Sequence, residues 1–281
     1  MNIKTTKLQS FISFIRKYLL VMIMARRVSR RKEPSRDLYT LKEQNKIDTG
    51  IFDTKTMIYL SKFYNKHVID KLDFIIARGK EADVYIAEPG NSEIVGSAKY
   101  VTIKFFRVET SSFVKMSDYI TGDPRFSHIR ASRNKKEIVE IWCRKELGNL
   151  KIAEFGGVLA PRPYMVNGSI LAMEFIGNED GVPARQLKDV RLDDPSAFLD
   201  SIIEQARKLY KAGLVHADLS EYNILVHEKK PYLIDMGQAV VLRHPNSRMF
   251  LERDIRNILD YFSKRYGIKK DYGKVAEYII R

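Results

Sequence analysis

Cysteine is almost absent from this sequence of 281 residues. Cys143 is the single one, so no disulfide can form within the chain. It stands beside Trp142 in a stretch with helical spacing, where we expect a buried, inert thiol. A reducing compartment such as the cytoplasm fits this composition, although scarce disulfides do not by themselves prove it.

Long apolar runs are also missing. Residues 8–25 are mostly apolar, but Arg16 and Lys17 interrupt them, and the longest uncharged run covers only residues 18–25. A membrane-spanning helix needs about 20 apolar residues. Two arginines follow the run directly, which is unlike the end of a signal peptide. We therefore expect a cytoplasmic chain with no membrane partner, and Met24 is an alternative start.

Acidic residues are in deficit. Lys and Arg number 49 against 35 Asp and Glu, which gives a net charge of +14 and a pI of about 9.6. Such a balance favours a polyanionic partner such as RNA or an acidic protein surface, although a solvated lysine-rich surface has the same composition. A basic cluster at residues 26–32 leads us to expect a loose basic tail over residues 1–46.

The order of elements predicts two lobes. Hydrophobic residues make up 44% of the chain, enough for one core divided around a cleft. Short β-rich segments precede one helix, capped by Ser132, and mostly helices follow. We therefore predict an α+β fold with N-terminal helices and an N-lobe over residues 47–173, and a hinge and helical C-lobe over residues 174–281. The expected helices cover residues 52–70, 132–150, 195–212, 247–265 and 271–280, and the expected strands cover residues 74–77, 83–87, 101–106, 171–176, 224–226 and 232–234.

Two neighbouring segments carry the chemistry. His216 begins a His-x-Asp-x-x-x-x-Asn sequence that contains Asp218 and ends at Asn223, and Asp235 leaves an apolar strand shortly before a glycine. A carboxylate such as Asp218 can accept the proton of an attacking hydroxyl. Asn223 and Asp235 offer the oxygen ligands that Mg²⁺ prefers, with Mn²⁺ as a substitute. Each residue alone is common in turns, but together they indicate phosphoryl transfer from ATP.

The N-terminal half supplies candidate ATP contacts. Lys104 lies in an apolar strand, where a phosphate-binding lysine explains its presence better than an edge-strand charge does. A helix glutamate should pair with it, and we choose Glu146 over Glu137. A glycine turn and a hinge strand should supply the remaining contacts, which are Gly79, Lys80, Glu81, Ala82 and Val84 in the turn and Met173, Glu174 and Ile176 in the hinge.

The chain resembles the RIO family of atypical serine protein kinases, and most closely the type-1 RIO group in a compact archaeal-like form. Four passages carry the resemblance, and they are residues 79–85, 117–126, 216–223 and 233–240. It implies a trimmed kinase fold with extra N-terminal helices and no usual activation loop. It also implies an aspartyl-phosphate intermediate, which would fall on Asp235, with Asp218 as proton acceptor. Asp83 stands where asparagine is usual, which should add negative charge near the phosphates.

The resemblance also implies partners. These are the pre-small ribosomal subunit with its rRNA, whose maturation the family assists, and protein serines including those of the chain itself. We expect a monomer or a weak dimer. Two alternatives stay open, a nucleotide-gated RNA scaffold with little turnover and a small-molecule kinase, and the passage 117–126 disfavours the second.

Overall fold

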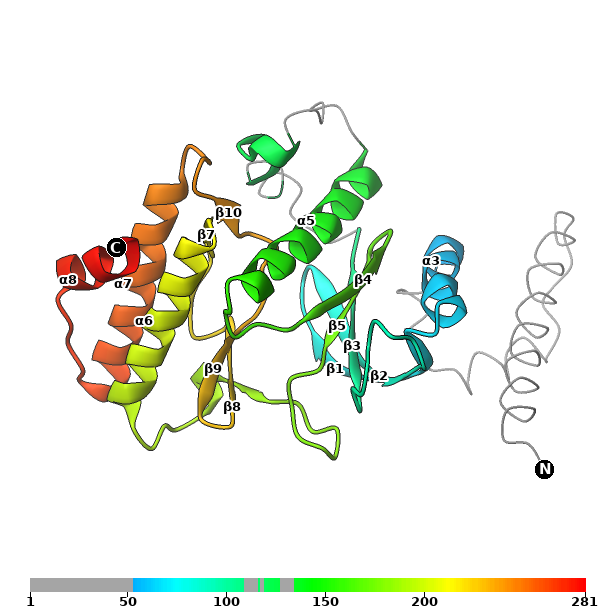
Figure 1. Cartoon of the computed structure of the whole chain (residues 1–281), viewed down its shortest axis with the longest axis horizontal. Coiled ribbons are helices and arrows are strands. Elements are labelled where there is room, and N and C mark those ends of the chain that lie inside the picture. The colour runs from blue at the N-terminus through cyan, green and yellow to red at the C-terminus, as the bar shows by residue number, and fades with distance from the viewer. Residues whose placement is uncertain (1–52, 109–115, 117–118, 127–133) are drawn as a thin grey trace, which may run out of the picture. The chain divides into compact units, whose positions relative to one another are not determined.

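The computed structural model describes residues 53–281 except 109–115, 117–118 and 127–133. The predicted basic tail therefore lies outside the described residues. The N-lobe is built on a five-stranded antiparallel sheet of order β1-β2-β3-β5-β4 (Figure 1). Its strands are β1 (Ile69–Arg78), β2 (Ala82–Pro89), β3 (Val101–Phe106), β4 (Pro163–Asn167) and β5 (Ile170–Glu174).

The two faces of this sheet have different tasks. Strand β3 is buried along its whole length, and alternation sends its side chains to opposite faces. Ile103 and Phe105 join a core closed by helix α3 (Thr54–Asn65). Lys104 points to the other face, level with Val84 on β2 and Leu171 on β5. The side chain of Lys104 therefore points from this second face of the sheet toward helix α5.

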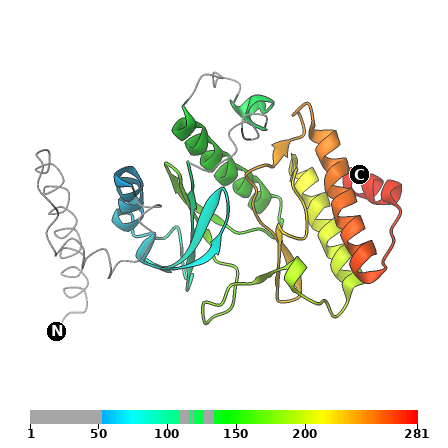
Figure 2. The ribbon, with the colours of Figure 1, turned by 180° about the vertical axis from the view of Figure 1, so that it is seen from behind.

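Helix α5 (Lys135–Phe155) joins the two parts of the fold. It contacts strands β4 and β5 on one side and β7 on the other, and Figure 2 shows it between the sheet and the C-terminal helices. The predicted N-cap, Ser132, is wrong, because the side chain of Asn134 caps the helix by accepting from the amide of Glu137. Asn134 is equally able to satisfy an exposed helix amide, so the true cap lies two residues later.

Helices dominate the C-lobe. Helix α6 presents an apolar stripe containing Phe198, Ile202 and Leu209 to the main core. Gly213, with φ of +94°, ends this region as predicted. The elements are α6 (Pro195–Lys211), α7 (Ser247–Tyr266) and α8 (Tyr272–Ile280), strands β6 (Arg185–Gln186), β7 (Leu214–Val215), β8 (Ile224–His227), β9 (Lys230–Leu233) and β10 (Val240–Val241), and the 3-10 turns η1 (Pro124–Phe126) and η2 (Leu187–Asp189).

The predicted α+β, two-lobed architecture is confirmed, but several element predictions were wrong or incomplete. Strands β6, β7 and β10 were not predicted, and the helix expected over 132–150 extends to Phe155. The helix expected over 52–70 ends at Asn65, and β1 begins at Ile69. Strand β4 was missed, and the strand expected over 171–176 ends at Glu174. The chain turns at His67, where φ is +52°. The helix stops before this residue because the following residues pair as strand β1 with β2. No helix in the described part of the chain is long and apolar enough to cross a membrane.

Candidate active site

Lys104 is held by two carboxylates. Its Nζ lies 2.8 and 2.9 Å from the two oxygens of Glu146 and 3.0 Å from Oδ1 of Asp235. Burial acts to lower the pKa of Lys104, but Asp235 and Glu146 outweigh it, so the pKa is raised and the ammonium is retained. The pairing of Lys104 with Glu146 that the sequence predicted is present.

Asp235 leaves strand β9 in a strained conformation. Its φ is +60°, a left-handed value that costs a non-glycine residue about 1–3 kcal/mol. The side chain is 44% exposed, and the ammonium of Lys104 lowers its pKa. The preceding residue, Ile234, donates its amide to the carbonyl of Asn223 at 3.0 Å. The hairpin of β8 and β9 therefore brings Asp235 next to Asn223, as the sequence indicated.

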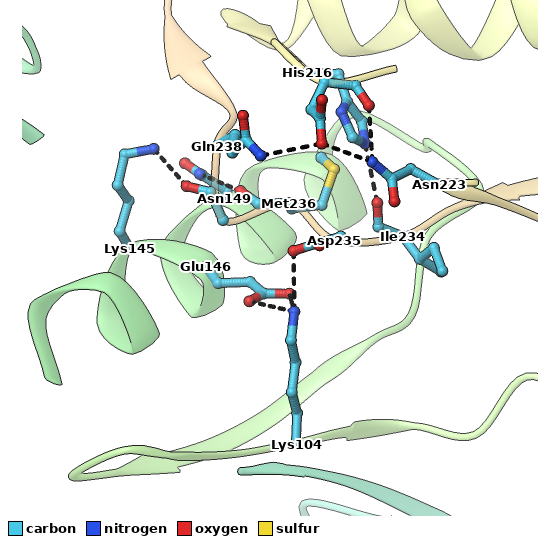
Figure 3. A network of polar contacts seen from close by, with 12 residues as sticks. Lys104, Lys145, Glu146, Asn149, His216, Asn223, Ile234, Asp235, Met236 and Gln238 are labelled. Carbon is cyan, nitrogen blue, oxygen red and sulfur yellow. Dashed lines mark hydrogen bonds and ion pairs between the residues drawn. The ribbon is translucent and has the colours of Figure 1, made fainter. Parts of the chain in front are cut away.

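Asp218 and Asn223 form a local pair (Figure 3). Asn223 Nδ2 donates to the carbonyl of Asp218 at 2.8 Å and to its Oδ2 at 2.9 Å. These two bonds use the amide nitrogen, which leaves Oδ1 of Asn223 as the ligand end. Gln238 Nε2 donates to the same Oδ2 of Asp218 at 3.0 Å, a contact that sequence reasoning missed.

The residues after Asp235 are fastened to helix α5. Lys145 Nζ donates to the carbonyls of Gly237, at 2.8 Å, and Ala239. Asn149 Nδ2 donates to the carbonyls of Met236, at 2.7 Å, and Ala239, at 2.9 Å. Both side chains are fully buried, and burial lowers the pKa of Lys145 to about 7. One helix therefore positions both Lys104, through Glu146, and the loop that follows Asp235.

Asp254 on helix α7 holds the other loop. Its carboxylate accepts from the amides of Ala217, at 2.7 Å, and Leu219, at 2.9 Å. These residues flank Asp218, and Ala217 has a left-handed φ of +64°. Arg253 donates to the carbonyl of Ala217. Burial raises the pKa of Asp254 to about 7.

His216 links the two loops without carrying charge. Its Nε2 donates to the carbonyl of Ile234 at 3.1 Å. Burial lowers the pKa of His216 to about 4, so the imidazole is neutral near pH 7. The histidine of the motif is therefore a structural bridge between residues 216–223, the candidate catalytic loop, and the end of β9.

The glycine turn is short and tightly bonded. Gly79 donates its amide to the carbonyl of Ala82 at 2.9 Å. A Cβ at position 79 would lie 3.2 Å from that oxygen, which explains the glycine. Lys80 is exposed, whereas Glu81 and Val84 are half-buried.

The expectation that Asp83 adds charge near the phosphates is wrong. Its side chain is fully buried and accepts two of its hydrogen bonds from Nη2 of Arg107, at 2.6 and 2.7 Å, and one from Nε, at 2.9 Å. This two-pronged ion pair neutralises the carboxylate. The partner comes from the end of the next strand, so no local sequence signal identifies it.

The predicted hinge contacts lie where β5 ends. Thr102, which shares the sheet face of Lys104, stands opposite Met173. The amide of Glu174 donates to the carbonyl of Arg162 at 2.8 Å, and the carbonyl of Ile176 accepts from Ala184 at 2.9 Å. These two bonds fix the backbone at the predicted adenine contacts Glu174 and Ile176.

Part of the passage 117–126 is described, and it packs near the catalytic loop. Tyr119 stacks on Phe250 with ring centroids 5.1 Å apart, and its hydroxyl accepts from Arg253 at 3.4 Å. Asp123 is fully buried and pairs with Arg125, the shortest contact being 2.6 Å. The segment is thus connected to Arg253, which also holds Ala217.

The donor set fits Mg²⁺ bound together with a nucleotide. Among the described residues, no group of three or more His, Cys, Asp and Glu side chains could hold a metal ion alone. Mg²⁺ is usually bound by one or two carboxylates with phosphates and water completing its shell. Asn223 Oδ1 and an oxygen of the exposed Asp235 side chain are suited to that arrangement.

Four residues of the site were missed from sequence. Lys145, Asn149 and Asp254 are buried polar residues in apolar helix faces, which is a usable signal, since such groups need a specific partner. Gln238 follows the Asp-Met-Gly sequence on a loop, where no periodicity marks it.

Comparison with known proteins gives a consistent family. The RIO domain matches residues 83–275. The RIO-type serine/threonine-protein kinase Rio1 of Haloferax volcanii is 37% identical over 259 residues, which cover 91% of this chain and 86% of that protein. The Rio1 kinase of Thermoplasma acidophilum is 46% identical over 185 residues, covering 66% of this chain and 96% of that protein.

A solved structure agrees on the fold. It is the Rio2 kinase–ADP/Mg²⁺–phosphoaspartate complex from Chaetomium thermophilum, with a TM-score of 0.61 at 20% identity, covering 87% of this chain and 75% of that one. Fold, domain match and relatives point to the same group. The chain therefore belongs to the RIO kinase family, within its Rio1 group of serine/threonine-protein kinases.

Proposed function

We propose that this kinase transfers the γ-phosphoryl group of Mg²⁺-bound ATP through an aspartyl-phosphate on Asp235, with Asp218 as the proton acceptor. The observation that carries the proposal is the contact of Lys104 with both Glu146 and Asp235, at 2.8 and 3.0 Å, next to the pair of Asp218 and Asn223. A fixed lysine, two oxygen ligands and a carboxylate base are the parts that phosphoryl transfer needs.

The nucleotide would lie between the lobes. Lys104 would contact its phosphates, and Asn223 with Asp235 would hold Mg²⁺, which neutralises phosphate charge. The turn residues Gly79, Lys80, Glu81, Ala82 and Val84 would cover the phosphates, and Met173, Glu174 and Ile176 would receive the adenine. Glu146 acts indirectly, by keeping the ammonium of Lys104 in place.

Phosphorylation of Asp235 requires no proton transfer. A carboxylate oxygen of Asp235 attacks the γ-phosphorus, the bond to the β-phosphate oxygen breaks, and ADP leaves. In the second step, water or a serine hydroxyl attacks the phosphorus, the bond to Asp235 breaks, and Asp218 takes the proton of the attacking oxygen. Water as acceptor gives ATP hydrolysis, and serine gives protein phosphorylation. The exposed Asp235 side chain and the phosphoaspartate of the Chaetomium relative support this route.

ATP turnover and phosphoenzyme formation test the proposal. Wild type incubated with γ-labelled ATP and Mg²⁺ should carry label that hydroxylamine removes, as expected of an acyl phosphate. Asp235→Asn should lose both label and turnover, and Asp218→Asn should keep the label but turn over slowly. Asp260→Asn, an exposed site on α7, serves as control. Unchanged turnover in Asp235→Asn would exclude this mechanism.

We further propose that the chain acts in the cytoplasm on maturation of the small ribosomal subunit, with pre-rRNA as partner. The net charge of +14 supports a polyanionic partner. It equally favours a second candidate, a nucleotide-gated RNA scaffold with little turnover. Binding of wild type and Asp235→Asn to purified small-subunit particles, measured at several salt concentrations, separates the two. Release that requires turnover supports the first, and equal binding and release support the scaffold.

A further inference from the structure

Gln238 touches the carboxylate that our proposed function uses as proton acceptor. Its Nε2 lies 3.0 Å from Oδ2 of Asp218, and Asn223 Nδ2 reaches the same oxygen at 2.9 Å. Two amide donors hold this oxygen in place and so restrict rotation of the carboxylate about its bond to Cβ. Gln238 is half-buried and comes from the loop after Asp235, whereas Asn223 comes from the loop of Asp218 itself.

The backbone of Gln238 is unusually well fixed. Lys145 donates to the carbonyls on both sides of it, those of Gly237 and Ala239. Asn149 adds a second bond to Ala239 at 2.9 Å. Helix α5 therefore fixes the backbone that carries the Gln238 side chain, and the same helix positions Lys104 through Glu146. Figure 3 shows this route from α5 to the catalytic loop.

We propose that Gln238 is a positioning residue for the proton-transfer step alone, because it orients Asp218 toward the attacking oxygen. This inference rests on the proposed function. Formation of the phosphoryl bond to Asp235 moves no proton, so it does not require an oriented Asp218. Release of the phosphoryl group to water or serine sends a proton to Asp218, so it does.

Gln238→Met is the test variant, since methionine nearly matches glutamine in volume and shape but donates no hydrogen bond. Asp260→Asn, at an exposed position on α7, is the control variant. Rapid-quench labelling with γ-labelled ATP measures phosphoenzyme formation, and steady-state turnover measures its breakdown. Urea unfolding checks that both variants are folded, and Gln238→Leu provides a second uncharged variant without a donor.

The expected result is a separation of the two steps. In Gln238→Met, turnover falls by roughly 10- to 100-fold, within the contribution of a general base. The KM for ATP and the rate of labelling stay within about twofold of wild type, and labelled enzyme accumulates. In the double variant with Asp218→Asn, Gln238→Met adds no further loss, since both changes remove the same function. Asp260→Asn behaves as wild type.

Three results would overturn the inference. They are unchanged turnover in Gln238→Met, an equal fall of labelling and turnover, and full additivity with Asp218→Asn. Failure of the aspartyl-phosphate proposal is recognised separately, as turnover by wild type without labelled enzyme. The role of Gln238 is then decided by kcat and the double variant, because direct transfer to water or serine also sends its proton to Asp218.

Discussion

Replacement of Asp254 by asparagine isolates the support of the catalytic loop. The change preserves size and alters one atom and the charge. Asp254 Oδ2 accepts from the amide of Ala217 at 2.7 Å and Oδ1 from that of Leu219 at 2.9 Å. Asparagine keeps one acceptor and turns an NH₂ group toward the other amide. One buried N–H of the loop is therefore left without an acceptor.

The magnitude follows from that single lost contact. A hydrogen bond to a charged group contributes about 1.5–3 kcal/mol, and an unsatisfied buried donor costs about 1–3 kcal/mol. The left-handed backbone of Ala217, with φ of +64°, costs about 1–3 kcal/mol and needs this support. The lost contact lowers the free energy of unfolding by at most about 2–4 kcal/mol, because asparagine also removes the buried charge that raises the pKa of Asp254. Turnover should fall roughly 100-fold, as for a small displacement of a catalytic group.

The assay pairs urea unfolding with ATP turnover on the same samples. The pKa of Asp254 is raised by burial to about 7, so measurements belong at about pH 8.5, where the carboxylate is ionised. Asp260→Asn, exposed on the same helix, controls for loss of a negative charge. Turnover is compared at urea concentrations where both proteins are folded, so that the loop defect is separated from unfolding.

The reasoning would be refuted by a variant that behaves like the control. If Asp254→Asn unfolds within about 0.5 kcal/mol of wild type, the range of ordinary surface changes, and also turns over ATP normally, the two bonds do not support the backbone of Ala217. If it is less stable but turns over ATP normally, Asp254 stabilises the fold and does not position Asp218.

Two further predictions follow. Glu146→Gln should lower the free energy of unfolding by about 3 kcal/mol, which is the low end for a broken buried ion pair because Asp235 still faces Lys104. It should also raise the KM for ATP at least about tenfold. Glu137→Gln, at the alternative partner considered from the sequence, should change neither the stability nor the KM. Burial lowers the pKa of His216 from 6.5 to about 4. Between pH 6.5 and pH 4 the unfolded chain therefore binds more protons than the folded chain. The free energy of unfolding falls as the pH is lowered through this range, by about 3 kcal/mol in all. Unfolding at several pH values should show this loss in wild type and not in His216→Gln, and an equal loss in both would contradict it.

The local sequence pattern was sufficient to predict the elements whose buried side stays the same along their whole length. Helix α6 was predicted almost to the residue, because its apolar stripe, Pro195 and Gly213 all agree. Strand β3 was predicted in full for the same reason. The apolar stripe over residues 52–70 was misleading, since pairing of β1 with β2 begins at Ile69 and decides where α3 stops.

The sequence by itself determined the family and the two-lobed fold, and it supplied the residues proposed to carry the chemistry, because Lys104, Asp218, Asn223 and Asp235 lie in recognisable local patterns. Apart from the pairing of Lys104 with Glu146, only the tertiary structure decided which side chains hold them. Arg107, at the end of β3, neutralises Asp83 on β2. Asp254 on α7 binds the amide of Ala217 in the catalytic loop. Lys145 binds the carbonyl of Gly237, which is 92 residues later in the chain, and so fixes the loop of Gln238. Burial makes each of these groups demand a partner, but the identity of that partner depends on packing between segments far apart in the chain.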